Sequence, residues 1–196
     1  MPEPSHLCGI LLAAGSGSRF GGGKLAHPLP ASGVPLVVAA WRHLKAAVPQ
    51  SCAVVRAGDA AVIALLRAEG ARVIECDDAA EGMGRSLSCG VRANPYAAGW
   101  IVALGDMPTL RIETIAAVAR SLRQGAAIAI PVRDGQRGHP VGFAVRFGAE
   151  LSELRGDAGA RSVLKAHATD VTEVHVDDPG ILADVDTRAD LARVAS

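Results

Sequence analysis

Two cations stand within one glycine-rich stretch near the start of the chain. Arg19 and Lys24 follow a short apolar run, residues 7–12, and three consecutive glycines, residues 21–23, separate them. The guanidinium group offers a planar fork to phosphate oxygens, whereas the ammonium group is a compact point charge. Glycines let the backbone approach a ligand and point successive N–H groups into one concavity that suits phosphate. This stretch predicts a nucleoside triphosphate site.

Two well-known phosphate loops do not fit this stretch. The dinucleotide fingerprint requires a third glycine where Phe20 stands, and the Walker loop requires Ser or Thr where Leu25 stands. A flexible turn with two solvated cations is the alternative to a phosphate site.

A carboxylate follows a second apolar stretch. Asp106 comes shortly after residues 100–104 and two residues before Pro108. A carboxylate in this position can hold Mg²⁺, which prefers one or two carboxylates together with phosphate oxygens and water. The alternative is a turn or helix-capping aspartate.

Two further segments carry side chains that suit ligand binding or capping. Gly82, Gly84 and Ser86 form a glycine-flanked turn at the start of an expected helix, where N–H groups and a hydroxyl could face a base or ribose. An ordinary helix start is the alternative. Thr187 and Asp190 have the spacing of a capping box, which predicts the start of the last helix.

The elements that would position these residues alternate along the chain. Apolar runs at residues 7–12, 51–57, 71–76, 100–104 and 126–132 predict strands. Helical patterns at residues 35–47, 59–69, 84–93 and 111–123 lie between them. The alternation predicts an α/β three-layer sandwich with a Rossmann-like, mostly parallel sheet. Because ligands bind at the carboxyl ends of such strands, the glycine-rich stretch, residues 77–86 and Asp106 should meet at one edge.

Composition sets the class of protein. The 196 residues suggest a single domain over 1–196, and 49% hydrophobic residues exclude a disordered chain. With 20 basic and 20 acidic residues, nothing indicates nucleic-acid binding. No apolar run approaches the ~18 residues of a membrane span, and the start, MPEPSH, lacks the basic region of a signal peptide.

The cysteines add an expectation about the compartment. None of the four belongs to a Cys-x-x-Cys pair, which favours reduced, mostly buried thiols in a cytoplasmic protein. The four residues are Cys8, Cys52, Cys76 and Cys89.

The motifs resemble, in order, those of the MobA-like nucleotidyltransferase superfamily, and most closely its molybdenum cofactor cytidylyltransferase branch. The first is AAGSGSRFGGGK, at residues 13–24. The others are EGMGRSLSCG (81–90), ALGDMP (103–108), RGHPVGF (137–143), GDAGAR (156–161) and ADVDTRADL (183–191). The set spans nearly the whole chain. The superfamily usually has Pro where Arg188 stands, which loosens the last match.

The resemblance implies Mg²⁺-dependent transfer of CMP from CTP to the phosphate of molybdopterin, with release of pyrophosphate. Arg19, Lys24 and Asp106 would be catalytic, and Asp106 would hold the metal. Asp186 would either be a second metal ligand or belong only to the start of the last helix. The implied nucleotide-binding residues are Leu12, Ala13, Ala14, Gly15, Gly17, Arg19, Lys24, Gly82, Ser86 and Asp106. The implied acceptor-binding residues are Arg137, Gly138 and His139.

Three more expectations follow from the resemblance. Residues 140–145 are the candidate for the one antiparallel strand of the superfamily's sheet. Alanine at position 14 resembles the cytidylyltransferase branch, whereas the guanylyltransferase branch tends to carry glycine there. A client molybdoenzyme is a candidate partner. The alternatives are GTP as donor, a sugar-phosphate-like acceptor, or a nucleotide-binding chaperone that delivers cofactor without catalysis.

Overall fold

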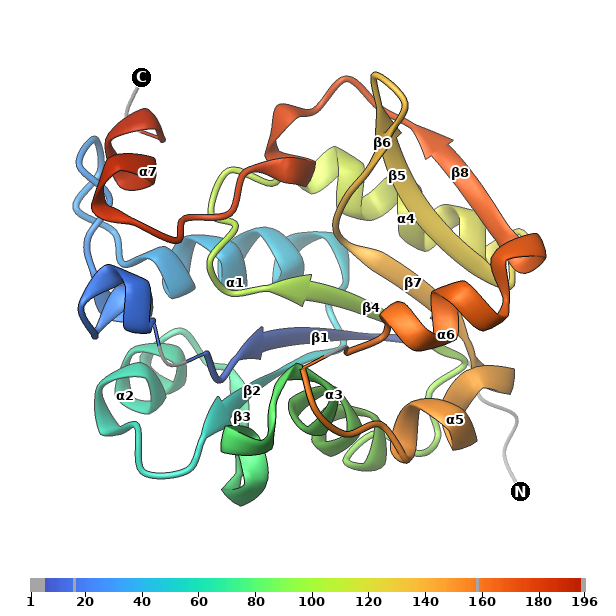
Figure 1. Cartoon of the computed structure of the whole chain (residues 1–196), viewed down its shortest axis with the longest axis horizontal. Coiled ribbons are helices and arrows are strands. Elements are labelled where there is room, and N and C mark those ends of the chain that lie inside the picture. Colours follow the sequence, from blue (N-terminus) through green and yellow to red (C-terminus); the bar gives the residue numbers. More distant parts are fainter. Residues whose placement is uncertain (1–5, 16, 158, 195–196) are drawn as a thin grey trace.

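The strands form one eight-stranded sheet in the part of the chain that the computed structural model describes, residues 6–15, 17–157 and 159–194 (Figure 1). The order across the sheet is β3-β2-β1-β4-β7-β5-β6, and β8 pairs with β5. The strands are β1 (Leu7–Ala13), β2 (Ser51–Arg56), β3 (Arg72–Cys76), β4 (Gly99–Leu104), β5 (Ile128–Arg133), β6 (Gln136–Arg137), β7 (Val141–Ala144) and β8 (Val171–His175).

Strand directions match the expected sheet. β1 pairs in parallel with both β2 and β4, and β2 pairs in parallel with β3. β7 is antiparallel to β4 and to β5, which confirms the antiparallel strand predicted at residues 140–145. Sequence patterns did not predict β6 or β8. β8 has no fully buried residue, so it lacks the apolar run that marks the central strands.

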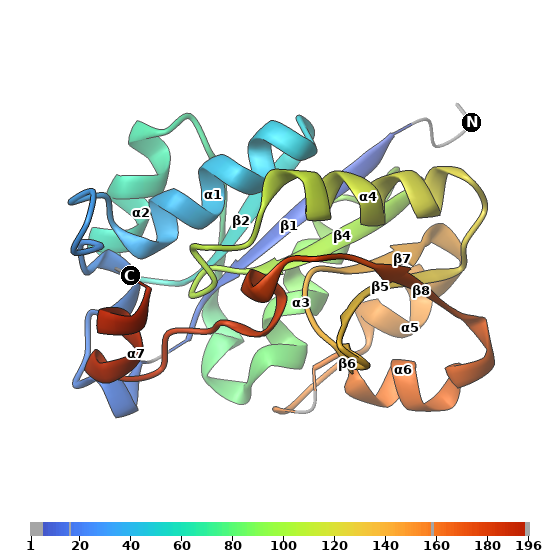
Figure 2. The same cartoon turned by 90° about the horizontal axis from the view of Figure 1, so that it is seen from above.

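Helices cover both faces of the sheet, as Figure 2 shows. One face carries α1 (Leu36–Ala47), α2 (Ala60–Ala68) and α4 (Ile112–Arg123). The other carries α3 (Met83–Arg92), α5 (Gly148–Ser152) and α6 (Arg161–Ala166). Every residue of β1 is buried. Its Leu11 packs into the first layer and its Ile10 and Leu12 into the second, because successive strand residues point to opposite faces. The predicted three-layer sandwich is confirmed.

The last helix, α7 (Arg188–Arg193), lies apart from these layers. Its Leu191 packs with Phe20, Leu36 and Val185 in a small separate cluster. The C-terminal segment therefore sits against the glycine-rich stretch that follows β1.

Two of the four cysteines differ from the prediction. Cys76 ends β3 and Cys89 lies in α3, and the two form a disulfide with their Cα atoms 6.2 Å apart. Expecting reduced thiols was wrong for this pair, because β3 and α3 fold back on each other and join residues 13 positions apart without a Cys-x-x-Cys spacing. Cys8 and Cys52 are free and buried, as predicted.

Two expectations concern a membrane span and a signal peptide. None of the described helices is both long and apolar enough to span a bilayer. Most of the segment on which the signal-peptide argument rests, residues 1–5, lies outside the described residues.

Candidate active site

A cavity of about 300 Å³ opens at the carboxyl ends of β1, β2 and β4. Ligand cavities in proteins start at about this size. The predicted residues that line it are Leu12, Ala14, Gly15, Lys24, Gly82, Ser86 and Asp106. The segments expected at one edge of the sheet thus meet there. Ala13, Gly17 and Arg19 are not among the lining residues.

The glycine-rich stretch folds back on itself and is anchored by one aromatic ring. The Gly17 carbonyl accepts hydrogen bonds from the N–H groups of Phe20, at 3.0 Å, and Gly22, at 3.1 Å. Gly17 and Gly22 both have positive φ, which glycine adopts without strain. Phe20 is buried against Leu36 and Leu191. The stretch is therefore a shaped loop rather than a flexible turn. Ser16 lies outside the described residues.

Lys24 is the centre of the charged end of the cavity. Its side chain is only 7% exposed, and its Nζ donates to Asp106 Oδ2 at 2.8 Å and to Asp186 Oδ1 at 3.0 Å. Burial alone would lower the pKa of this ammonium group, but the charges and hydrogen bonds of the two carboxylates outweigh burial and raise it. The two carboxylates converge on one cation from segments that are 80 residues apart in the sequence.

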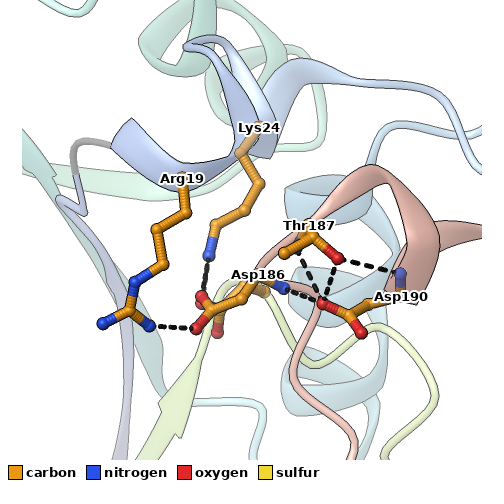
Figure 3. A network of polar contacts seen from close by, with 6 residues as sticks. Arg19, Lys24, Asp186, Thr187 and Asp190 are labelled. Atoms are coloured by element: carbon orange, nitrogen blue, oxygen red, sulfur yellow. Dashed lines mark hydrogen bonds and ion pairs between the residues drawn. The ribbon is translucent and has the colours of Figure 1, made fainter.

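Asp186 lies directly before the predicted start of the last helix, and its carboxylate faces the glycine-rich loop. Thr187 and Asp190 form the capping box of α7, so the predicted helix start is confirmed. The Asp186 carboxylate is not needed for that cap and instead pairs with Lys24 and, at 3.0 Å, with the Arg19 guanidinium (Figure 3). The hydrogen bond from Lys24 is the main reason that the pKa of Asp186 lies below its usual range. Arg19 itself is 79% exposed.

A backbone contact holds Asp186 beside the sheet edge. The Val185 N–H donates to the Asp106 carbonyl at 2.9 Å, and the Val185 side chain is fully buried. On the other side, the Gly105 N–H donates to the Leu12 carbonyl at 2.9 Å and so ties Asp106 to β1. The position of both carboxylates is thus set by backbone hydrogen bonds rather than by their ion pairs alone.

The opposite end of the cavity is a glycine turn at the start of α3. Gly82 has a φ of +115°, and a Cβ there would overlap the backbone of Gly156. The Gly84 N–H donates to the Gly156 carbonyl at 2.8 Å, and a Cβ on Gly84 would lie 2.8 Å from the Arg155 carbonyl oxygen. Close packing of residues 155–157 therefore explains both glycines. Ser86, on the first turns of α3, is buried and lines the cavity.

The predicted acceptor residues lie outside this cavity. Arg137 is exposed, and its Nε donates to Glu173 Oε1 at 2.9 Å. Gly138 packs so closely on Ile181 that a Cβ would overlap the Ile181 carbonyl, and the His139 N–H donates to that carbonyl at 3.0 Å. Burial lowers the pKa of the His139 imidazole, so the ring is neutral at neutral pH. Ala158, within the segment 156–161, lies outside the described residues.

A second hollow, of about 640 Å³, lies on the other side of Asp186. Its wall includes Pro179, Gly180 and Leu182, the turn on which Gly138 and His139 pack through Ile181. Asp186 lines this second hollow, and its ion pair with Lys24, which lines the first cavity, connects the two. The segment 137–139 therefore contacts the turn that forms part of the wall of the second hollow, through the Ile181 carbonyl.

Sequence reasoning missed part of the first cavity. The unpredicted lining residues are Leu25, Arg56, Ala79, Ala80, Met83, Leu104 and Asp157. Arg56 is the last residue of β2, so its place at the carboxyl end of a parallel strand was the signal that could have identified it.

The number of side chains that could bind a metal is small around Asp106 and Asp186. Among the described residues, no group of three or more His, Cys, Asp or Glu side chains could hold a metal ion. Asp106 and Asp186 are nevertheless close enough to share one ammonium group. Such a pair fits Mg²⁺, whose remaining ligands are commonly phosphate oxygens and water.

The sequence profile of the MobA-like NTP transferase domain matches residues 9–171, which contain β1, the glycine-rich loop and Asp106. The chain belongs to this family. It is thus a nucleotidyltransferase by domain type, and the predicted superfamily is confirmed.

Two relatives of the chain carry different activities in their names. Nicotine blue oxidoreductase of Paenarthrobacter nicotinovorans is 34% identical over 194 residues, which cover 95% of each chain. Phosphoenolpyruvate guanylyltransferase of Nocardia farcinica is 35% identical over 141 residues, 69% of this chain and 60% of the relative.

Solved structures agree with the fold over nearly the whole length. Rv0371c of Mycobacterium tuberculosis H37Rv superposes with a TM-score of 0.81 at 26% identity, covering 97% of this chain and 98% of that one. The same protein in complex with manganese superposes with a TM-score of 0.75 over the same shares.

Proposed function

We propose that the protein transfers CMP from CTP to the phosphate of molybdopterin and releases pyrophosphate. The observation that carries the proposal is the hydrogen bonding of Lys24 Nζ to both Asp106 and Asp186 beside a cavity of about 300 Å³. This arrangement suits a ligand that brings both negative phosphates and a bound metal cation. The Lys24 ammonium group can then pair with phosphate while the two carboxylates pair with the metal, so that no charge is left unpaired.

The reaction needs positioning and charge neutralisation more than covalent help from the protein. An oxygen of the acceptor phosphate forms a bond to the α-phosphorus of CTP. The bond from the α-phosphorus to the bridging oxygen breaks, and pyrophosphate leaves with that electron pair. Lys24 would bind the α-phosphate region, and Arg19, which is exposed at the mouth of the loop, would bind the β- and γ-phosphates.

Mg²⁺ would be held by Asp106, with Asp186 as a second ligand, and would neutralise phosphate charge when bound. The absence of a third protein ligand among the described residues is compatible with this choice, because Mg²⁺ commonly keeps water and substrate oxygens as ligands. The Asp186 backbone N–H would keep its hydrogen bond to the Asp190 carboxylate whether or not the metal is bound.

The second hollow is the proposed place for the acceptor. It adjoins Asp186 and is supported by Gly138 and His139 through Ile181. The segment 137–139 would then act on the acceptor by holding this wall rather than by direct contact. A client molybdoenzyme would receive the product.

Two observations favour second candidates. The guanylyltransferase named above is a relative over two thirds of this chain, which favours GTP and another phosphate acceptor. The relative named nicotine blue oxidoreductase favours a redox reaction. A cofactor-delivery chaperone would bind nucleotide without turnover.

Pyrophosphate release tests the proposal. The parent protein is given CTP, GTP or UTP, each with and without molybdopterin, in Mg²⁺ buffer. We expect release only when CTP and the acceptor are both present. No pyrophosphate release with any of the three nucleotides, together with reduction of nicotine blue by a nicotinamide coenzyme, would instead support the redox candidate.

A further inference from the structure

One cation in the first cavity has no role in the mechanism above. Arg56, the last residue of β2, is half-buried and lines the cavity beside Ala79, Ala80 and Gly82. Among the described residues it has no hydrogen bond or ion pair. A guanidinium group that is partly withdrawn from water without a protein partner is costly unless a ligand satisfies it.

Other cations around the cavity are already paired. Lys24 binds two carboxylates, and Arg85, on α3 next to the same wall, binds Asp78 at 2.8 Å. Asp157, the remaining charged lining residue besides Asp106, packs beside Gly82 and forms no ion pair with Arg56 among the described residues. Arg56 is therefore the cation that the cavity leaves open to a ligand among its described residues.

The strand order places Arg56 two strands away from Asp106, the proposed metal ligand. Asp106 follows β4, and Arg56 ends β2, with β1 between the two strands. Neighbouring strands lie about 4.8 Å apart, so the two strand ends are roughly 10 Å apart. This separation suits the distance from the α-phosphate to the base of a nucleotide. Small residues, Ala79, Ala80 and Gly82, leave room for a flat ring there.

A guanidinium group only donates hydrogen bonds and binds best to two acceptors side by side. Cytosine offers such a pair in O2 and N3. Uracil carries a hydrogen on N3, and adenine places an amino donor beside N7, whereas guanine offers O6 and N7. Resting on the proposed nucleotidyl transfer, we propose that Arg56 reads the acceptor edge of the base and thereby selects cytosine over uracil.

Nucleotide binding by calorimetry tests this role without needing the acceptor. Binding of CTP, UTP, GTP, ATP and CMP is measured for the parent, Arg56→Met and Arg56→Lys, with Arg67→Met on the exposed side of α2 as the matched control. We expect the parent to bind CTP at least about 10-fold more tightly than UTP. In Arg56→Met this ratio should fall towards one, and CMP should lose affinity by the same factor as CTP. Arg67→Met should behave as the parent.

Arg56→Lys keeps the charge but loses the planar fork, so it should bind CTP with part of its affinity and with a reduced preference over UTP. It also serves if Arg56→Met does not fold. An unchanged CTP-to-UTP ratio in both variants would overturn the inference, as would an equal loss for all four triphosphates with no loss for CMP. A parent that binds no nucleotide would overturn the proposed function as well. A parent that prefers GTP would overturn both the cytidylyl assignment and the selection of cytosine by Arg56, and would leave nucleotidyl transfer intact.

Discussion

The two ends of the cavity are built in opposite ways. At one end, Lys24, Asp106 and Asp186 come from three distant segments and satisfy one another. At the other, the Gly82 turn is packed against residues 155–157, and the disulfide between Cys76 and Cys89 joins the two sides of this turn. The charges at the first end, the charged end, thus pair with one another. At the second end, which we call the base end after the proposed position of the nucleotide base, Arg56 is left without a partner among the described residues.

The difference indicates how each end would respond to a nucleotide. The charged end must exchange partners when phosphates arrive, so its residues influence turnover and the pH dependence of stability. The base end keeps its shape, so its residues influence which nucleotide is chosen. Substitutions at the two ends should therefore separate rate from selectivity.

The largest effect is expected at the charged end. Asp106→Asn should lower turnover by about 100-fold or more, because a neutral amide neutralises less phosphate charge through a bound cation. The fold should persist, since Lys24 keeps Asp186. Steady-state kinetics with Mg²⁺ measure the change, and Asp177→Asn, at a fully exposed carboxylate, is the control. Turnover near the parent value would remove Asp106 from the reaction.

The next effect concerns stability and pH. Lys24→Met should cost roughly 1–3 kcal/mol of unfolding free energy at pH 7, because it leaves two partly exposed carboxylates facing each other. The folded-state pKa of Asp186 is lowered by Lys24, so this contribution is present above about pH 3.9 and is lost as pH falls through the lower folded value. Lys24 has a raised pKa, so its contribution is lost again only above its ordinary value of about 10.4.

Urea unfolding at pH 7, 5 and 3 measures this dependence. The parent and Lys24→Met should differ most at pH 7 and converge towards pH 3, while exposed Lys165→Met should follow the parent throughout. A constant gap across these pH values would mean that the ion pairs do not contribute to stability.

A smaller effect is expected beside the base end. The disulfide joins residues 13 positions apart, and a cross-link of this length stabilises a fold by about 3 kcal/mol or less. Cys89→Ser should lose that amount relative to the oxidised parent, and the parent treated with a dithiol reductant should lose the same. Unfolding curves with and without reductant give the result. Equal stability of the parent in both conditions would show that the cross-link does not form.

The smallest effect should be on nucleotide choice. Ala14 is buried and lines the cavity, so in the proposed complex its methyl group would take up space beside the base. One methyl group discriminates by ~1–3 kcal/mol at most in such pockets. Ala14→Gly should therefore relax the preference for CTP over GTP by a few fold without loss of turnover. Competition between the two nucleotides measures the ratio, and an unchanged ratio would assign selectivity to other residues.

The extent of sequence prediction follows from how local each signal is. β1 and β4 were predictable because each is an apolar run with a glycine within two residues of its end. The Thr187–Asp190 cap was predictable because capping depends on residues three apart. Each of these features depends on residues that are close together in the sequence.

Long-range contacts left no such pattern. The Asp186–Lys24 ion pair joins residues 162 positions apart, and the hydrogen bond from the Val185 N–H to the Asp106 carbonyl helps to bring them together. The Cys76–Cys89 bond depends on how β3 and α3 fold back. Gly58 and Asp59, which follow Arg56, indicate only the turn and the N-cap of α2, and the order of the strands is what brings Arg56 to the cavity.

Following the α-phosphate of CTP tests the central claim most directly. CTP labelled at that phosphate is incubated with molybdopterin, Mg²⁺ and the parent protein, and the pterin product is separated and counted. The account predicts that the label enters the pterin product, that a label on the γ-phosphate leaves as pyrophosphate, and that Asp106→Asn transfers neither. Equal transfer from GTP would contradict the cytidylyl assignment, and no transfer from any nucleotide would contradict nucleotidyl transfer to this acceptor.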